Sequence, residues 1–261
     1  MFKALWRYRH FVLSSVRNEY RGRFARSAFG GLWAFLNPLA EVAIYALILS
    51  NVLAARFDGI DNKYSFAIYL TSGILAWSLF ANVVNRSLNL FIASGELIKK
   101  VHFPKVVLPA TVVGVAIVDN LLLALAIAGV FTLLGHVPGL YVLWLPVLMG
   151  ITLAFAISIG LILGILNVFI RDIGQVVPIA LQFGFWLTPI VYPPHIIPES
   201  WRHWLMLNPM VPIVEAYHSV LAFGRPPELA PVLVVAASAL FLLGLAFLMF
   251  MRASEEMADA L

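Results

Sequence analysis

The residues best suited to chemistry form a stripe of polar and aromatic side chains early in the chain. Its members lie four positions apart: Trp33, Asn37, Glu41 and Tyr45. On a helix of about 3.6 residues per turn they stay near one face. Most of their neighbours are apolar, so we expect this face either to meet another helix or to line a water-filled path.

A second group lies further along the chain and combines aromatic rings with one amide. It comprises Gln182, Phe183, Phe185, Trp186 and Tyr192. Rings can stack on the C–H faces of sugars while an amide binds hydroxyl groups, so this composition suits a carbohydrate. The alternative is an ordinary packed membrane helix with Tyr192 in an interfacial aromatic belt, and spacing alone favours that alternative.

Motifs of catalysis are missing from the chain. It contains no Gly-Lys dipeptide and therefore no P-loop, and no GxGxxG, HExxH, GxSxG or CxxC motif is present. Cysteine is absent, and the six histidines show no ligand spacing, so we expect them in loops or interfaces and expect no metal site. The sequence predicts a protein that is not an enzyme and binds no cofactor itself.

The elements that position these residues must be membrane helices. Apolar residues make up 62% of the 261 residues and charged residues only 11%, too few to cover a soluble fold of this size. We predict an all-α polytopic membrane protein with a single domain at 1–261. Six stretches are long enough to cross a bilayer of about 30 Å: residues 31–53, 66–85, 106–134, 140–170, 173–192 and 229–251. The fourth is longer than needed, so it should tilt or bend near Pro146.

Basic residues predict the orientation of these spans. Six spans place both termini on one side, together with all of the 17 lysines and arginines except Arg56, Lys63, Arg202 and Arg225. The positive-inside rule puts that side in the cytoplasm, and it explains the basic charge without nucleic acid. Within 1–27, apolar residues recur every three or four positions between basic ones, which predicts an amphipathic helix at the membrane surface. The tail 252–261 is cytoplasmic.

Two ionisable residues, Glu41 and Asp119, lie inside predicted spans, where each costs about 2.5–3.5 kcal/mol to insert. For Asp119, which precedes Asn120, we favour a role in packing between helices. Asp172 is expected to cap the helix of span five. In span four, Ala156, Gly160 and Gly164 form a small-residue face for close helix contact. A charged segment at 94–104 could dock a soluble partner or form only a turn.

The proline-rich stretch 193–227 lies on the outer side. Pro198 could begin one short helix, and Asn208 with Pro209 should begin a second that ends near Gly224. The second helix is too short to cross the bilayer and too apolar to stand free in water. We predict two re-entrant helices here, and the alternative is an interfacial hairpin that only anchors span six.

Six blocks of sequence, in order, resemble the ABC-2 permeases that export polysaccharides. They are GLWAFLNP (31–38), YLTSGILAW (69–77), LIKKVHFP (97–104), LNVFIRDI (166–173), FWLTPIVYP (185–193) and LNPM (207–210). The likeness looks greatest to the membrane subunits of O-antigen exporters, the Wzm type, with capsule and teichoic-acid permeases as near relatives. Related chains often carry an aromatic residue in place of Asn37, so the aromatic lining would be thinner here.

The resemblance implies a homodimer in the bacterial inner membrane, paired with two copies of a separate ATPase that binds ATP and Mg²⁺. The substrate would be a polysaccharide linked to an undecaprenyl-type lipid, moved from cytoplasm to periplasm. Spans one and five would line its path through Trp33, Asn37, Glu41, Tyr45, Gln182, Phe185, Trp186 and Tyr192. Gating and ATPase coupling would involve Arg17, Arg21, Glu96, Lys99, Lys100, His102, Arg171 and Asp172. A periplasmic gate would contain Trp201, Trp204, Asn208 and Tyr217.

Other functions stay open at this point. A permease of the same superfamily could carry capsule, teichoic acid, a lipid or a drug. A proton-coupled secondary transporter would use Glu41 or Asp119 as its proton carrier and need no ATPase. A membrane-bound enzyme that modifies glycans would need a reactive cluster near a membrane face, and the sequence has none.

Overall fold

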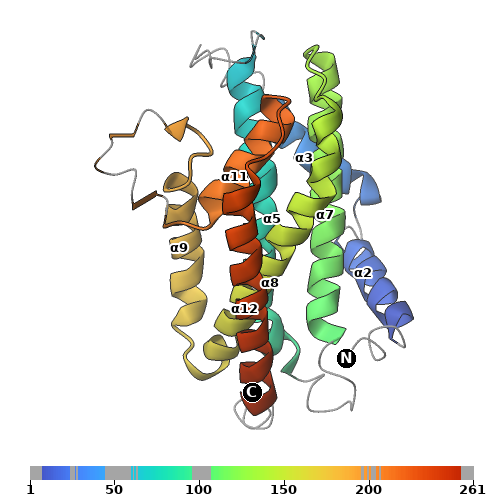
Figure 1. The fold of residues 1–261 in the computed structure, drawn as a ribbon. Helices are drawn as coiled ribbons and strands as arrows, with labels where there is room; N and C mark the ends of the chain where they lie inside the picture. Colours follow the sequence, from blue (N-terminus) through green and yellow to red (C-terminus); the bar gives the residue numbers. More distant parts are fainter. Residues whose placement is uncertain are drawn as a thin grey trace.

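The computed structural model of this chain describes residues 8–23, 27, 29–44, 60, 62, 64–95, 107–194, 197–198, 200, 204–205 and 207–253. Helices are the only regular elements of this part of the chain (Figure 1). Two of them come before the long helices: α2 (Arg9–Arg23) and, after the short turn η1 (Gly30–Leu32), α3 (Trp33–Ile44). The all-α prediction is confirmed for the described residues.

Four long apolar helices form the body of the molecule: α5 (Ser65–Ala93), α7 (Val107–Leu133), α8 (Leu145–Phe169) and α12 (Leu229–Ala253). Each is long and apolar enough to cross a membrane, α8 together with the preceding 3₁₀ turn η3 (Leu140–Trp144). They correspond to predicted spans two, three, four and six. Helices α5, α8 and α12 run in one direction and α7 runs in the other, and the start of α2 and the end of α12 lie at the same end of the bundle (Figure 1).

The other two predicted spans are not confirmed. In span one α3 reaches Ile44, and residues 45–53 lie outside the described residues. In span five α9 (Ile173–Trp186) has 14 residues, or about 21 Å at 1.5 Å per residue, which is less than the bilayer core. Its helix ends six residues before Tyr192 because Pro189 disfavours a helical Thr188. The Thr188 hydroxyl instead donates to the Gly184 carbonyl at 2.7 Å.

The expected cap of α9 is also wrong. Asp172 already has helical torsion angles, φ −64° and ψ −25°, and its side chain makes no capping hydrogen bond. Its backbone carbonyl accepts the amides of Gln175 and Val176. A bend is expected near Pro146, but Pro146 lies in the first turn of α8, where a missing N–H costs nothing. The change of helix type comes just before it, between η3 and α8.

Helices α5 and α8 are in close contact. A Cβ atom on Gly160 would lie 2.6 Å from the Cβ of Ser87, and one on Gly164 would collide with the Ser87 carbonyl oxygen. Ala156, the third member of the predicted small-residue face, is fully buried. The small residues therefore bring the two backbones together, as predicted, and fix α5 in the centre of the bundle.

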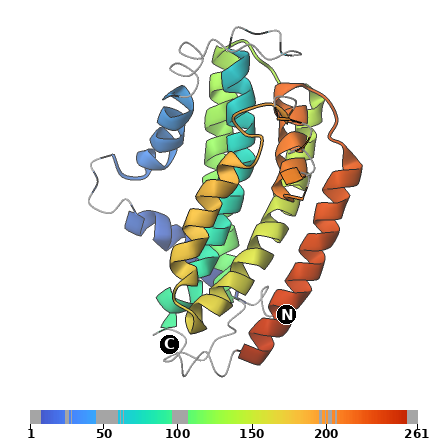
Figure 2. The ribbon, with the colours of Figure 1, turned by 90° about the vertical axis from the view of Figure 1, so that its left-hand side faces the viewer.

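A shorter helix, α11 (Met210–Tyr217), continues as a π-helical turn, η5 (His218–Ala222), and packs against α5 and α8. The side-chain oxygen of Asn208 accepts the Met210 amide at 3.0 Å, which confirms the predicted cap. The segment stops at Gly224, whose φ of +58° suits glycine. Figure 2 shows α12 on one side of the bundle and α3 on the opposite side.

Candidate functional site: a polar cavity and its surroundings

Helix α2 packs along α7. Val16 is the nearest side chain to Gly114 of α7, where an added Cβ would lie 2.9 Å from it. Arg17 and Arg21 are exposed, so the basic face of α2 points away from this contact. The predicted helix between 1 and 27 is confirmed over Arg9–Arg23, whereas its position at the membrane surface and the assignment of Arg17 and Arg21 to ATPase coupling stay predictions.

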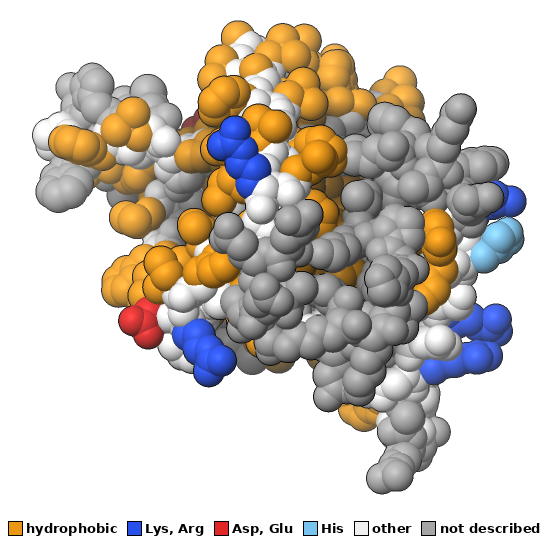
Figure 3. Space-filling view, turned by 90° about the horizontal axis from the view of Figure 1, so that it is seen from below, with side chains coloured by type: hydrophobic (Ala, Val, Ile, Leu, Met, Phe, Trp, Pro, Cys, Tyr) orange, Lys and Arg blue, Asp and Glu red, His pale blue; other side chains and the backbone are white. Residues whose placement is uncertain are grey.

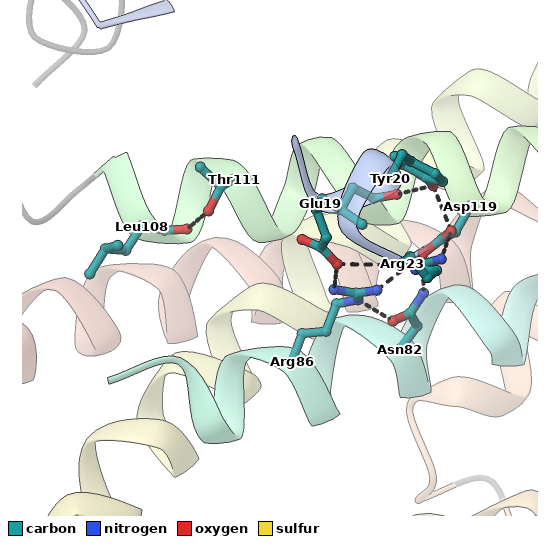
Figure 4. Close-up of polar contacts among 9 residues, drawn as sticks. Glu19, Tyr20, Arg23, Asn82, Arg86, Leu108, Thr111 and Asp119 are labelled. Atoms are coloured by element: carbon teal, nitrogen blue, oxygen red, sulfur yellow. Dashed lines mark hydrogen bonds and ion pairs between the residues drawn. The ribbon is translucent and has the colours of Figure 1, made fainter. Parts of the chain in front are cut away.

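Asp119 of α7 is the centre of a charged cluster that joins three helices (Figure 4). Its Oδ1 accepts hydrogen bonds from the Tyr20 hydroxyl at 2.6 Å and from Arg23 at 2.9 Å, both on α2. Its Oδ2 accepts from Asn82 at 3.2 Å and from Arg86 at 3.4 Å, both on α5. The expected role of Asp119 in packing between helices is confirmed.

Glu19 completes this charged cluster, which we define as Glu19, Tyr20, Arg23, Asn82, Arg86 and Asp119. Arg86 and Arg23 both donate to the Glu19 carboxylate, so two guanidinium groups face two carboxylates. A carboxylate offers about four acceptor positions, and those of Asp119 are all used. Burial raises the pKa of the Tyr20 hydroxyl, and its hydrogen bond to Asp119 acts in the same direction, so Tyr20 stays a donor.

Part of this cluster can be inferred from the sequence. The predicted span two ends at residue 85 and leaves Arg86 on the cytoplasmic side, but α5 extends to Ala93 and carries Arg86 within the helix. An acidic residue in one span and a basic residue in another indicate a pair, because isolated charges in the membrane are costly. Arg23 contributes to the prediction of topology alone, because nothing in its spacing indicates a partner 96 residues away.

The stripe on α3 opens onto a polar cavity of about 240 Å³. Trp33, Asn37 and Glu41 all line this cavity, and all three are exposed. Its other polar wall residues are Ser78 and Asn82 of α5, Asp119 and Asn120 of α7, and Arg23 of α2. The polar face of α3 therefore meets polar residues of two spans, which sequence spacing could not reveal. Tyr45 lies outside the described residues.

Helix α9 carries an exposed apolar face. Val176, Ile179, Phe183 and Trp186 are each more than half exposed and follow helical spacing. Gln182 is also exposed, whereas Phe185 turns inward and contacts the Trp77 ring edge to face at 6.1 Å. The Tyr192 hydroxyl donates to the Trp186 carbonyl at 2.7 Å. Phe183 was absent from the predicted path residues, although it shares the face of Trp186.

A larger, apolar cavity of about 780 Å³ lies between α5, α8 and α9. Trp77, Phe155 and Leu181 are among its walls, and Trp204 and Asn208 close part of it. The Asn208 amide donates to the Thr188 hydroxyl at 2.9 Å and so ties this segment to the end of α9. Such a cavity has the chemistry to accept hydrocarbon and few groups that could bind a sugar.

The residues predicted for a periplasmic gate differ in their surroundings. Trp204 is 70% exposed, whereas Tyr217 is fully buried in the bundle. Next to it His218 is buried and stacks on Tyr69 at 3.7 Å between ring centroids. The expectation that every histidine lies in a loop or interface is therefore wrong for His218. Trp201 lies outside the described residues.

At the opposite end, Arg171 and Gln175 line a polar hollow of about 370 Å³ between α5, α8 and the start of α9. Arg171 and Asp172 are both exposed there. Figure 3 views this end of the molecule, and basic side chains stand at several points around it. The other predicted coupling residues, Glu96, Lys99, Lys100 and His102, lie outside the described residues.

Comparison with known proteins adds an independent finding. A family model described as "ABC-2 type transporter" matches residues 11–222. The chain is 31% identical over 264 residues to the "O-antigen export system permease protein RfbA" of Myxococcus xanthus, with 100% of this chain and 99% of the relative covered.

Two further relatives are more distant. An "O-antigen export system permease protein RfbA" of Klebsiella pneumoniae is 29% identical over 210 residues, covering 80% of this chain and 79% of the relative. The "Polysialic acid transport protein KpsM" of Escherichia coli is 26% identical over 216 residues, covering 80% of each. The segment that the family model matches, residues 11–222, includes α3, α9 and the charged cluster.

Proposed function

Since this chain belongs to the ABC-2 type transporter family, we propose that it is the membrane permease of an ATP-driven exporter of lipid-linked O-antigen polysaccharide. The observation that carries the proposal is the full-length likeness to an O-antigen export permease. Polysaccharide export also agrees with the polar and aromatic residues that α3 presents to its cavity. Transport would run from cytoplasm to periplasm across the bacterial inner membrane.

The proposed assembly is a homodimer with two copies of a separate ATPase, because the chain has no P-loop. Six spans with both termini in the cytoplasm complete the proposed topology. The exposed face of α9 supports a path there, since it would otherwise expose the polar side chain of Gln182 to lipid. The segment 193–227 would form re-entrant helices and the outer gate.

A second substrate class has its own support. The likeness to a polysialic acid transport protein makes capsule polysaccharide the next candidate. O-antigen is favoured because that relative shares higher identity over the full length of both chains. A proton-coupled mechanism through Asp119 has less support, because its carboxylate already accepts four hydrogen bonds, from Tyr20, Arg23, Asn82 and Arg86.

A clean deletion of the reading frame tests the proposal. The deletion should remove the polymer from the cell surface and cause lipid-linked polymer to accumulate inside the cell, and a plasmid copy should restore export. If O-antigen is unchanged but capsule is lost, the permease function stands with the second substrate. If all surface glycans stay at wild-type levels, the proposed function is wrong.

A further inference from the structure

The polar cavity between α3, α5 and α7 has the chemistry of a binding site. We propose that it is a subsite within one protomer that binds a single sugar ring of the exported glycan. The inference rests on the proposed function and adds residues of spans two and three to the path expected along α3 and α9. Its volume of about 240 Å³ is below the roughly 300–1,000 Å³ typical of ligand pockets, which suits one ring rather than several.

The walls of the cavity supply the groups that bind a polyol. The Asn37 amide can donate and accept, and the Glu41 carboxylate accepts. The Ser78 hydroxyl donates to the Leu75 carbonyl and can still accept, and the Asn82 amide, which donates to Asp119 and accepts from Arg86, keeps a second N–H. Sugar hydroxyls also donate and accept, so they match such a mixed set. Trp33 adds a half-exposed aromatic surface on which the C–H face of a ring can stack.

Asn120 provides a separate indication that a ligand completes this site. It is only 3% exposed, and its amide nitrogen donates to the Leu75 carbonyl at 3.0 Å. Its side-chain oxygen accepts no hydrogen bond from any residue that the structure describes. A buried acceptor without a donor is costly, and Asn120 is one of the residues that line the cavity, so the proposed subsite assigns that donor to a hydroxyl group of the ligand.

The charges around the cavity favour a neutral ligand over a phosphate. Arg23 lines the cavity but already donates to Asp119 and to Glu19. The carboxylates of Glu41 and Asp119 lie in the same walls and repel anions. The four donors to Asp119 hold that carboxylate in place, so it acts as a rigid wall. Hydrocarbon fits the apolar cavity beside α9 instead. The two cavities would therefore hold the lipid part and the sugar part of the substrate separately.

A binding assay on the purified full-length chain in lipid nanodiscs tests the subsite. The ligands are the monosaccharides released by acid hydrolysis of the host's own surface glycan. Their binding is measured by saturation-transfer NMR and by tryptophan fluorescence. We expect saturable binding of at least one of them, with Kd raised at least tenfold in Asn37→Leu and in Glu41→Gln. The fluorescence change should disappear in Trp33→Phe. Phe35→Leu, an exposed position of α3 outside the cavity, is the control and should bind like wild type.

The proposed subsite is wrong if no sugar binds saturably, or if the cavity variants and the control bind with equal Kd values. It is also wrong if the fluorescence changes only when cations are added and not when sugars are added. Melting temperatures of the variants identify any folding defect. Because Asn37→Leu and Glu41→Gln differ chemically, a folding defect in one of them leaves the other as a test. The assay is independent of export. If deletion leaves all surface glycans intact, the proposed function fails; if deletion removes the polymer but cavity variants bind sugar normally, only the subsite fails.

Discussion

The Tyr20 hydroxyl lies 2.6 Å from the Asp119 carboxylate and thereby links the surface helix α2 to the middle of α7. Asn82 and Arg86 bring α5 to the same carboxylate from the other side. One acidic group therefore holds three helices together and forms one wall of the polar cavity. A movement imposed on α2 by a partner would reach α5 and α7 through this contact.

The first prediction concerns the charge of Asp119. Asp119→Asn keeps the shape but removes the charge and turns one oxygen into a donor that faces Asn82 and Arg86. Hydrogen bonds to charged groups contribute about 1.5–3 kcal/mol, so the variant should melt several degrees below wild type in the same detergent. Asp172→Asn is the matched control, since the Asp172 side chain caps no helix, and it should melt like wild type. Equal melting temperatures for the two variants would contradict the role of Asp119.

The second prediction is a pH dependence. Burial raises the pKa of the Tyr20 hydroxyl above its value in the unfolded chain, about 10. A raised pKa means that its stabilisation is fully present below about pH 10 and decreases as the pH rises above that value. The loss in melting temperature caused by Tyr20→Phe should therefore be constant from pH 6 to pH 9. A loss that shrinks within this range would show that Tyr20 ionises there.

The third prediction concerns the contact between α5 and α8. Gly164→Ala should destabilise the fold by about 1–3 kcal/mol, because its methyl group would collide with the Ser87 backbone. Gly150→Ala, in the same helix, meets no atom within 4 Å and should be neutral or slightly stabilising. Thermal unfolding of both variants in one detergent measures the difference. A Gly164→Ala protein as stable as Gly150→Ala would show that the helices are not in close contact.

The fourth prediction concerns the exposed face of α9. Trp186→Ala should reduce the amount of surface polymer at least several-fold while the protein is inserted in the membrane at its normal level. Phe241 of α12 is also an exposed aromatic residue, but it lies on a helix outside the proposed path, so Phe241→Ala should export normally. Surface glycan and membrane protein levels are measured side by side. Normal polymer in Trp186→Ala would remove this ring from the path.

The sequence predicts the long helices well because each depends on local hydropathy. It overextends α9, although the Thr188–Pro189 pair that ends the helix is visible in the sequence. The cap by Asn208 depends on residues two positions apart and was predicted correctly. Local patterns therefore carry most of the helical fold.

The polar cavity depends on contacts between residues far apart in the chain. Tyr20 and Asp119 are 99 positions apart, and one sequence gives no register between α2 and α7. The burial of His218 depends on how α11 and η5 pack against α5, which their composition does not specify. The sequence identified Trp33, Asn37 and Glu41 as a stripe, whereas only the packing of α5 and α7 reveals that the stripe faces a polar cavity.

Transport in inside-out membrane vesicles tests the central claim most directly. Vesicles are prepared from cells that make this chain, its candidate ATPase and the lipid-linked polymer, and glycosidase is added outside. The account predicts that ATP makes the polymer resistant to the glycosidase, and that resistance is lost without this chain or with an ATPase that cannot hydrolyse ATP. Resistance that develops without ATP, or with this chain alone, would contradict it.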